Sequence, residues 1–170
     1  MLKFNNNVPF IEGTSLNDIM KVCQTPFYIY SQDLITKKVE MTKKALGNKI
    51  FFSVKSNSNQ AILKLMQSLD IGADVVSIGE LKRAISAGFH PNKIIFEGVG
   101  KSKNDIEFAL NNNIRQINVE SIEELKLINE VAHSLKISAN IGIRFNPDID
   151  ALTLDKITTG RKKDKFGINL

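Results

Sequence analysis

From residue 49 onward, short apolar runs rich in β-branched and aromatic residues alternate with stretches of helical spacing. This alternation is typical of repeated βα units built around a parallel sheet. Five strands are predicted, at residues 49–54, 73–77, 93–96, 116–119 and 139–145, and each is followed by polar or glycine-containing sequence. The pattern places the chain in the α/β class.

The stretches between these strands each predict a helix with one apolar face. The first helix is expected to begin after Asn59 as its N-cap and to stop at Gly72. The second is expected to begin after Ser77 and to be ended by Gly88, and the third carries its apolar residues over positions 106–110.

The fourth helix has the clearest predicted start. Ser121 and Glu124 form the S-x-x-E pattern of a capping box, and an apolar face at helical spacing follows them. His133 lies near the predicted end of this helix, where it suits the helix dipole better than a catalytic role. His90 is expected to be a loop residue.

The first 48 residues do not follow the βα rhythm. Residues 27–30, FYIY, form a β-type run after Thr25 and Pro26, and residues 33–46 have a helical pattern. We predict that residues 1–24 are a lead-in segment and that residues 25–170 form the N-terminal part of one barrel domain.

The number of predicted strands bears on the choice between two α/β architectures. A closed (β/α)₈ barrel takes about 250 residues, so five strands do not complete one. An open doubly wound sheet can end at five strands, but it carries a glycine-rich phosphate loop after its first strand, and residues 53–59, SVKSNSN, contain no glycine. We therefore expect a partial TIM-type (β/α)₈ barrel, truncated before closure.

The composition is that of a globular protein with one sizeable core, because 42% of the 170 residues are hydrophobic. The single cysteine, Cys23, excludes an internal disulfide, and the polar N-terminus lacks the layout of a secretory signal. No apolar run approaches the ~20 residues that a membrane span needs. We expect a cytoplasmic protein with no membrane partner.

The net charge of +5 raises the question of nucleic-acid binding. The basic residues are scattered, and the one dense run, GRKKDK at residues 160–165, has no interleaved aromatic residues on which bases could stack. We predict that nucleic acid is not a partner.

Lys55 is the first candidate for chemistry. It follows the apolar run FFSV at the tip of a predicted strand and precedes a helix start. Active sites of α/β barrels collect at such strand ends, and a lysine there can bond covalently to the aldehyde of pyridoxal phosphate. A lysine at a strand end is more often simply solvated, so the rest of the chain has to decide between the two readings.

Polar side chains follow every predicted strand and would share one rim of a barrel. They are Lys55 and Asn57, then Ser77, Glu97 with GVGK at residues 98–101, Glu120, and finally Arg144 with Asn146. An active site at the top of a barrel requires such groups, although βα loops are polar in any case.

Other kinds of site find little support. GVGK at residues 98–101 places two glycines and a lysine before a helix start, but it lacks the G-x-x-x-x-G-K-[ST] spacing of a nucleotide-binding loop. The sequence has neither a Cys/His cluster with metal-ligand spacing nor a G-x-S-x-G elbow, so we predict no metal site and no α/β-hydrolase triad.

Six segments together carry a family resemblance: TPFYIYS, FSVKSNSN, GADVVSIGEL, FEGVGKS, INVES and IRFNPDIDALTLDKITTGRKKDKFGI. In this order, from about residue 25 to residue 168, they resemble the N-terminal half of the diaminopimelate decarboxylases. The resemblance implies a (β/α)₈ barrel carrying pyridoxal 5'-phosphate that decarboxylates meso-2,6-diaminopimelate, a small amino acid, to L-lysine. It also implies a homodimer for the complete family member.

The resemblance further implies site residues. Lys55, in the VK-x-N pattern, would be the lysine that binds the cofactor. Asp74 in GADVVS would lie near the cofactor, and Arg144 in IRFNP would lie beneath its ring. Local capping or pairing explains Asp74 equally well, and a salt bridge at the rim explains Arg144, so these alternatives stay open.

By the same resemblance, the family's phosphate loop, its pyridinium-facing glutamate, its substrate-binding residues and its C-terminal β domain would follow residue 170. The 170-residue chain alone is therefore expected to be inactive. Two alternatives to the decarboxylase reading remain: a non-catalytic remnant or binding module for pyridoxal phosphate that keeps Lys55, and a related amino-acid decarboxylase or racemase.

Overall fold

The computed structural model describes residues 2–47, 49–154, 157–161 and 163–169. The chain divides into two compact units, residues 1–49 and residues 50–170. Lys162, inside the basic run 160–165, lies outside the described residues.

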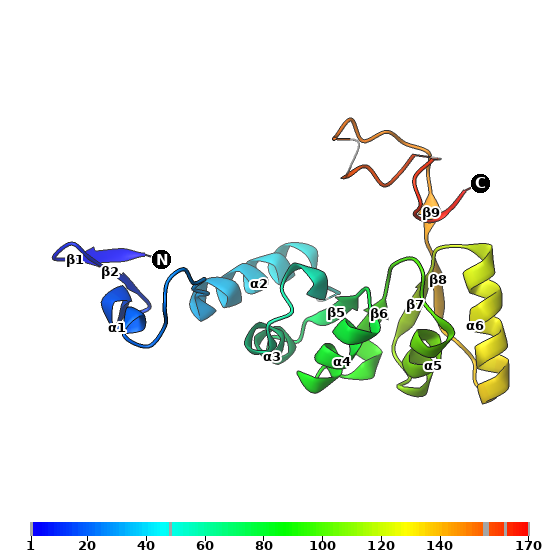
Figure 1. Ribbon diagram of the computed structural model, residues 1–170, viewed down its shortest axis with the longest axis horizontal. Helices are drawn as coiled ribbons and strands as arrows, with labels where there is room; N and C mark the ends of the chain where they lie inside the picture. Colours follow the sequence, from blue (N-terminus) through cyan, green and yellow to red (C-terminus); the bar gives the residue numbers. More distant parts are fainter. Residues whose placement is uncertain (1, 48, 155–156, 162, 170) are drawn as a thin grey trace. The chain divides into compact units, whose positions relative to one another are not determined.

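The first unit contains a small antiparallel sheet and two helices (Figure 1). Its elements are β1 (Lys3–Asn5), β2 (Val8–Ile11), β3 (Thr14–Ser15), α1 (Leu16–Met20) and α2 (Gln32–Leu46). Ser15 and Ser31 are the N-caps of the two helices, and each hydroxyl accepts a hydrogen bond from a backbone N–H in the first turn. The helix predicted over residues 33–46 is confirmed as α2.

The β-type run at residues 27–30 is not a strand, so this prediction is wrong. Tyr28 is 90% exposed and Tyr30 54% exposed. A β-favouring sequence becomes a strand only where a neighbouring strand supplies the ladder hydrogen bonds, and within the described residues nothing pairs with this run.

The second unit contains a five-stranded parallel sheet with the strand order β4-β5-β6-β7-β8. The strands are β4 (Phe51–Ser53), β5 (Gly72–Val75), β6 (Ile94–Phe96), β7 (Gln116–Val119) and β8 (Ile141–Ile143). All five predicted strands are therefore present, most of them shorter than predicted.

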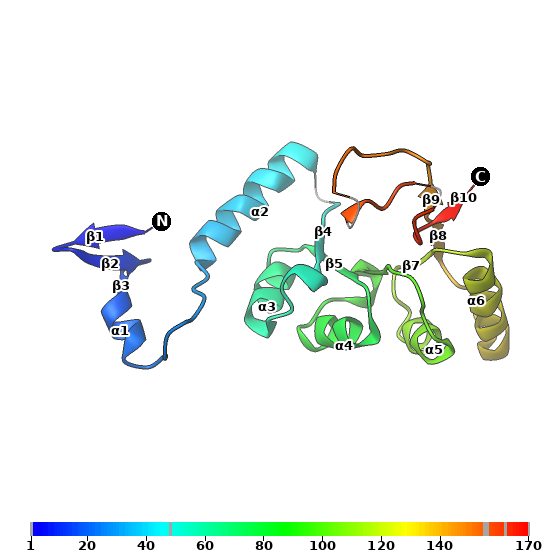
Figure 2. The same cartoon turned by 45° about the horizontal axis from the view of Figure 1, so that its top comes forward.

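Four helices cover one face of this sheet (Figure 2). They are α3 (Gln60–Ser68), α4 (Ile78–Ser86), α5 (Lys103–Asn111) and α6 (Ile122–Leu135), and short 3₁₀ turns occur at η1 (Val54–Ser56) and η2 (Pro91–Lys93). Sequential strand order with all helices on one face is the arrangement of a (β/α)₈ barrel, whereas a doubly wound sheet has helices on both faces. The expected partial barrel is confirmed.

The core of this unit lies between the sheet and its helices. Val75, Phe96 and Ile117 are almost completely buried, as are Leu81 of α4 and Ile106 of α5. Because successive strand residues point to opposite faces, the residues beside these core positions project from the face that the helices leave uncovered. Polar residues occupy many of those alternate positions, and they build the site described below.

The helix starts at Asn59 and Ser77 are confirmed, because each side chain accepts a hydrogen bond from a backbone N–H of the following turn. Gly72 does not end a helix: α3 stops at Ser68, and Gly72 is the first residue of β5. The turn is made instead by Asp70, whose φ of 60° lies in the left-handed region that aspartate tolerates better than most residues.

The capping box predicted at the start of α6 is only half formed. The Ser121 hydroxyl accepts from the Glu124 N–H at 3.1 Å, but the Glu124 carboxylate accepts from Lys101. A complete capping box occurs at the start of α5, between Ser102 and Asp105. The pattern thus located the helix but not the partner of its glutamate.

The predicted strand 139–145 is divided into β8 and a second short strand, β9 (Phe145–Asn146). Strand β9 pairs in parallel with β10 (Ile168–Asn169). The Asn146 side-chain amide also donates to the backbone oxygens of Arg161, at 2.9 Å, and Phe166, at 3.1 Å. These bonds attach the end of the chain to the end of β8.

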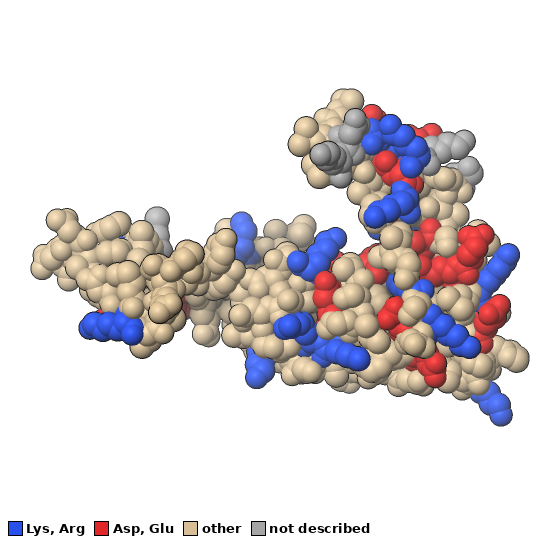
Figure 3. All heavy atoms as spheres, in the orientation of Figure 1, with Lys and Arg blue, Asp and Glu red and all other residues tan. Residues whose placement is uncertain are grey.

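Charged residues of both signs are interspersed over α3–α6 on the face seen in Figure 3, with no large patch of one sign there. Among the helices of the described residues, none has both the length and the apolar character that crossing a membrane requires.

Candidate active site at the strand ends

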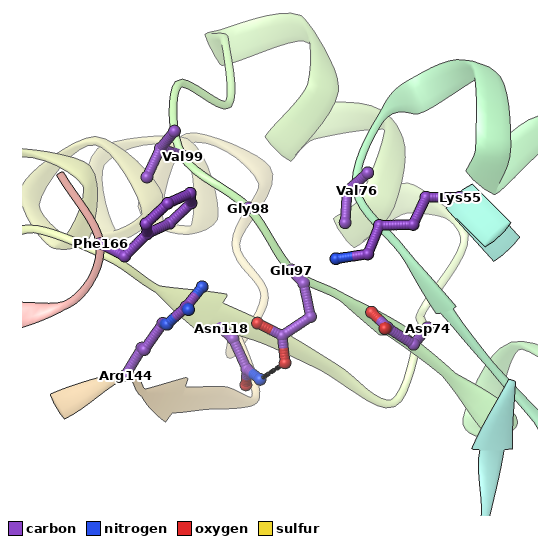
Figure 4. A pocket seen from close by; sticks show the side chains of 9 residues that line it. All are labelled: Lys55, Asp74, Val76, Glu97, Gly98, Val99, Asn118, Arg144 and Phe166. Carbon is purple, nitrogen blue, oxygen red and sulfur yellow. Dashed lines mark hydrogen bonds between the residues drawn. The ribbon is translucent and has the colours of Figure 1, made fainter. Parts of the chain in front are cut away.

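The carboxyl ends of the second unit's strands frame a cavity of about 550 Å³ (Figure 4). Its lining residues are Lys55, Asp74, Val76, Glu97, Gly98, Val99, Asn118, Arg144 and Phe166. A cavity of this volume suits a small organic ligand or cofactor. The three residues singled out in the sequence, Lys55, Asp74 and Arg144, therefore border one pocket.

The parallel sheet explains why residues so far apart in the sequence meet here. Lys55 lies in η1 directly after β4, Glu97 directly follows β6, and Arg144 directly follows β8. Asp74 and Asn118 lie within β5 and β7, on the face opposite the buried core residues. Parallel strands bring their carboxyl ends to one edge, so each βα unit contributes one polar group.

Lys55 extends from η1 into the pocket, with its amine on the same side as Asp74 and Glu97 (Figure 4). Its side chain is exposed, and within the described part of the chain it has no hydrogen-bond or ion-pair partner. An amine free of such partners is available for covalent chemistry with a carbonyl group.

Asp74 contributes a polar atom that the protein leaves unsatisfied. Its Oδ1 is buried and has no hydrogen-bond partner, and the same holds for Oγ of Ser53, which lies opposite Asp74 in the pairing of β4 with β5. A buried polar atom without a partner costs about 1–3 kcal/mol, so such atoms are rare unless a ligand or water satisfies them. Local capping of Asp74, the alternative reading of this residue, is not observed for that oxygen.

Glu97 is held at the pocket by a chain of side-chain amides. The Gln116 amide donates to Asn118 Oδ1 at 2.5 Å, and the Asn118 amide donates to a carboxylate oxygen of Glu97. Since the Asn118 oxygen is occupied by Gln116, its nitrogen must face Glu97. This chain fixes the Glu97 carboxylate on the pocket wall.

Arg144 occupies the opposite side of the pocket and forms an ion pair at the rim, as the alternative reading of this residue supposed. Its Nη1 donates to Glu120 Oε1 at 2.9 Å, and its guanidinium carbon lies 4.7 Å from the centre of the Phe166 ring. Because Arg144 also lines the cavity, the ion pair and a role toward a ligand are compatible.

The GVGK segment is a structural element and not a phosphate loop. The Lys101 side chain is only 2% exposed, and its ammonium donates to the oxygens of Gly98 at 2.6 Å, Asn118 at 2.8 Å and Glu124 at 2.8 Å. All three N–H groups of this ammonium are thus used inside the protein. Lys101 is not available to bind a phosphate.

Three of the predicted rim residues serve the backbone instead of the pocket. Asn57 accepts from the Asn59 N–H at 3.0 Å, Ser77 caps α4, and Asn146 attaches the end of the chain. These contacts agree with the alternative reading, in which residues after the strands are polar only because βα loops are polar.

Sequence reasoning missed three lining residues: Val76, Asn118 and Phe166. Asn118 could have been found, because Gln116 and Asn118 are polar at alternate positions of an otherwise apolar strand. The position of Phe166 depends on the pairing of β9 with β10, which joins residues about twenty positions apart and has no local signal.

The family to which the chain belongs follows from comparison with known families. The model described as "Pyridoxal-dependent decarboxylase, pyridoxal binding domain" matches residues 32–170, most of the chain. The chain belongs to this family. The match includes every residue of the pocket and the whole parallel sheet. Because the matched domain is the pyridoxal-binding domain of its family, the cofactor is pyridoxal phosphate, as the resemblance implied.

Curated relatives point to one branch of the pyridoxal-dependent decarboxylases. The chain is 49% identical over 154 residues to diaminopimelate decarboxylase of Helicobacter pylori, with 89% of this chain and 38% of the relative covered. It is 40% identical over 170 residues to diaminopimelate decarboxylase of Aquifex aeolicus, with 99% of this chain and 40% of the relative covered. The chain thus spans about two fifths of the length of these relatives.

Similar solved structures are also diaminopimelate decarboxylases. The crystal structure of diaminopimelate decarboxylase from Helicobacter pylori complexed with L-lysine matches with a TM-score of 0.84 and 46% identity, over 91% of this chain and 40% of that one. The enzyme from M. jannaschii in co-complex with L-lysine matches with a TM-score of 0.84 and 36% identity, over 100% of this chain and 41% of that one.

Proposed function

We propose that this chain forms the cofactor-binding wall of a pyridoxal phosphate-dependent enzyme that decarboxylates meso-diaminopimelate to L-lysine and carbon dioxide. The observation that carries the proposal is the amine of Lys55, without a partner in the described residues, in one cavity with the unsatisfied buried oxygen of Asp74. The names of the relatives, and the L-lysine in two of the similar structures, support the choice of substrate.

The residues at the pocket fit the cofactor chemically. Lys55 would supply the amine that holds the aldehyde of the cofactor, and Asp74 would supply an acceptor that the protein itself leaves free. Arg144 supplies a planar cation that can lie against an aromatic ring, as it already does with Phe166. The cavity of about 550 Å³ is large enough for the cofactor together with a small amino acid.

The bound cofactor supplies an electron sink for the electron pair left when carbon dioxide departs. The residues of this chain then have four tasks. Lys55 would hold the cofactor through its Nζ, and the same amine could carry a proton at the reacting centre when it is not bound. Asp74 and Glu97 place negative charge beside that amine, and Val76 and Val99 keep part of the pocket wall apolar.

Covalent trapping tests the assignment of Lys55. The 170-residue chain is incubated with pyridoxal phosphate, reduced with borohydride and digested, and the modified lysine is located by mass spectrometry. We expect the label on Lys55, and we expect Lys55→Ala to remove it while Lys64→Ala, a change at an exposed lysine of α3, leaves it in place. Labelling of Lys101 or Lys165 in place of Lys55 would contradict the assignment.

Growth complementation tests the reaction separately. A reading frame that encodes this chain together with the rest of the enzyme should restore growth without lysine to a bacterium that lacks diaminopimelate decarboxylase, and Lys55→Ala should abolish the effect. If the expressed protein is labelled at Lys55 but does not support growth, cofactor binding stands and the decarboxylase proposal is wrong. The cytoplasmic location, the homodimer and the exclusion of nucleic acid stay predictions.

A further inference from the structure

Glu120 is the most completely used carboxylate near the pocket, although it does not line the cavity. It directly follows β7, and its side chain is only 2% exposed. Oε1 accepts from Arg144 Nη1 at 2.9 Å and from the Gly98 N–H at 3.2 Å, and Oε2 accepts from the Gly167 N–H at 3.0 Å. One buried carboxylate therefore receives donors from three separate segments of the chain.

Each of these segments contributes to the pocket wall. Gly98 and Arg144 line the cavity themselves, and Gly167 is the neighbour of Phe166, which also lines it. The guanidinium of Arg144 lies over the Phe166 ring, so the two groups that Glu120 holds also contact each other. Movement of Glu120 would therefore displace one whole side of the pocket.

The backbone around Glu120 is shaped for this role. Gly98 and Gly167 have φ values of +94° and +76°, a region in which other residues are strained. A Cβ on Gly167 would lie 3.0 Å from the Arg144 carbonyl oxygen. Both donated N–H groups thus come from positions whose backbone conformation favours glycine.

Substitution of Glu120 by glutamine would not preserve this arrangement. A carboxylate accepts from several donors at once, whereas a glutamine has one acceptor oxygen and presents an N–H₂ group to the remaining donors. A buried donor that loses its acceptor is costly, especially when the donor is a guanidinium. The geometry therefore requires a charged carboxylate at this position.

We propose that Glu120 is a positioning residue that orients the Arg144 guanidinium toward the bound cofactor and holds Phe166 at the pocket wall. This inference rests on the proposed function, because it assigns Arg144 a role toward pyridoxal phosphate. Glu120 touches neither the cavity nor its contents, so it acts only through the groups that it binds.

The first test measures the side chain and needs no activity. Phenylglyoxal modifies accessible guanidinium groups, and the rate at Arg144 can be followed by mass spectrometry in the unliganded chain. Glu120→Gln should raise this rate several-fold, while Glu130→Gln, which removes an exposed glutamate from α6, should leave it unchanged. Equal rates in the Glu120→Gln variant and the unchanged chain would overturn the proposal.

The second test is a double-mutant cycle on the affinity for pyridoxal phosphate, read from its visible absorbance when bound. Glu120→Gln should weaken binding about tenfold, in line with the loss of a charged hydrogen bond. In the Arg144→Gln background the same change should have less than about a twofold effect, because a residue that acts through Arg144 has nothing left to position. Additive effects would mean a purely structural role.

Two controls separate the possible failures. If Glu120→Gln does not fold, Glu120→Asp keeps the charge on a shorter side chain, and it should give an intermediate loss of affinity in a folded protein. An unchanged affinity in a folded Glu120→Asp variant would then overturn the proposal. Absence of the Lys55 label in the unchanged chain would instead refute the proposed function, which the labelling experiment decides first.

Discussion

The two sides of the pocket differ in how their polar groups are satisfied. On the side of β4 and β5, Asp74 and Ser53 each have a buried oxygen without a partner, and Lys55 has no partner in the described residues. On the side of β7 and β8, Glu120 accepts three hydrogen bonds and Arg144 is paired. Polar groups on the first side are thus available to a ligand. Those on the second side are bonded within the protein and form a rigid frame for the pocket.

Two lysines show the same difference. Lys55 and Lys101 both follow strands of the same sheet, and both precede a helix. Lys55 is exposed at the cavity, whereas Lys101 is buried and bonded to three oxygens. Both lysines lie between a strand and a helix, so it is the surrounding hydrogen bonds that distinguish a reactive lysine from a structural one.

The largest effect is expected for Lys101, which supports the satisfied side of the pocket. Lys101→Met leaves the Glu124 carboxylate buried without its cation, and loss of one partner of a buried pair costs about 3–5 kcal/mol. Urea unfolding of the variant and of the unchanged chain measures the difference. Lys103→Met, at an exposed neighbour, should change the free energy of unfolding by less than about 0.5 kcal/mol.

A second substitution sharpens this prediction. Glu124→Leu combined with Lys101→Met removes both charges, so part of the lost stability should return. If Lys101→Met were no more destabilising than Lys103→Met, the buried pair would not be the support that the contacts indicate.

A smaller effect of opposite sign is expected for Asp74 on the unsatisfied side. Without cofactor, Asp74→Asn should leave the free energy of unfolding unchanged or raise it by about 1 kcal/mol, because it removes a buried charge that lacks a full set of partners. The same variant should bind pyridoxal phosphate more weakly. Unfolding with and without the cofactor measures both quantities.

Asp105 supplies the matched control for Asp74. Its Oδ2 accepts from the Ser102 N–H and hydroxyl in the capping box of α5, so Asp105→Asn should lower the free energy of unfolding slightly and leave cofactor binding unchanged. Clear destabilisation by Asp74→Asn in the absence of cofactor would mean that Asp74 belongs to the frame and not to the reactive side.

The smallest effect concerns Asp164, close to Phe166 on the satisfied side. The hydrogen bond from the Arg161 N–H, at 2.9 Å, holds the pKa of Asp164 below its ordinary value of 3.8. A carboxyl whose pKa is lowered in the folded state contributes stability above its ordinary pKa and loses it as the pH falls through the folded value. The turn should therefore persist at neutral pH and weaken only in acid below 3.8.

Carboxyl-carbon NMR measures this titration directly. The midpoint for Asp164 should lie below 3.8, and the Arg161 amide resonance should shift with the same midpoint. The Asp164→Asn variant should lack this transition at Arg161. A midpoint at or above 3.8 would show that the hydrogen bond does not form in solution.

Local sequence determined the parallel sheet, the helix starts and the pocket lysine of this protein. Alternating apolar runs, N-caps at Asn59 and Ser77, and Lys55 after a short apolar strand are all features of neighbouring residues. Propensity and capping act over one turn or one strand, so a pattern in the sequence carries them. The same reasoning was wrong for residues 27–30, which pair with no strand among the residues that the structure describes.

Tertiary structure alone decided which polar residues have hydrogen-bond or ion-pair partners inside the protein and which are available to a ligand. Glu124 begins a helix, as its sequence pattern predicted, but its charge is used by Lys101 from another loop. Phe166 reaches the pocket only because β10 pairs with β9, and Glu120 collects donors from residues up to 47 positions away. Hydrogen bonds and burial depend on distances across the sheet, and no local pattern along the chain records those distances.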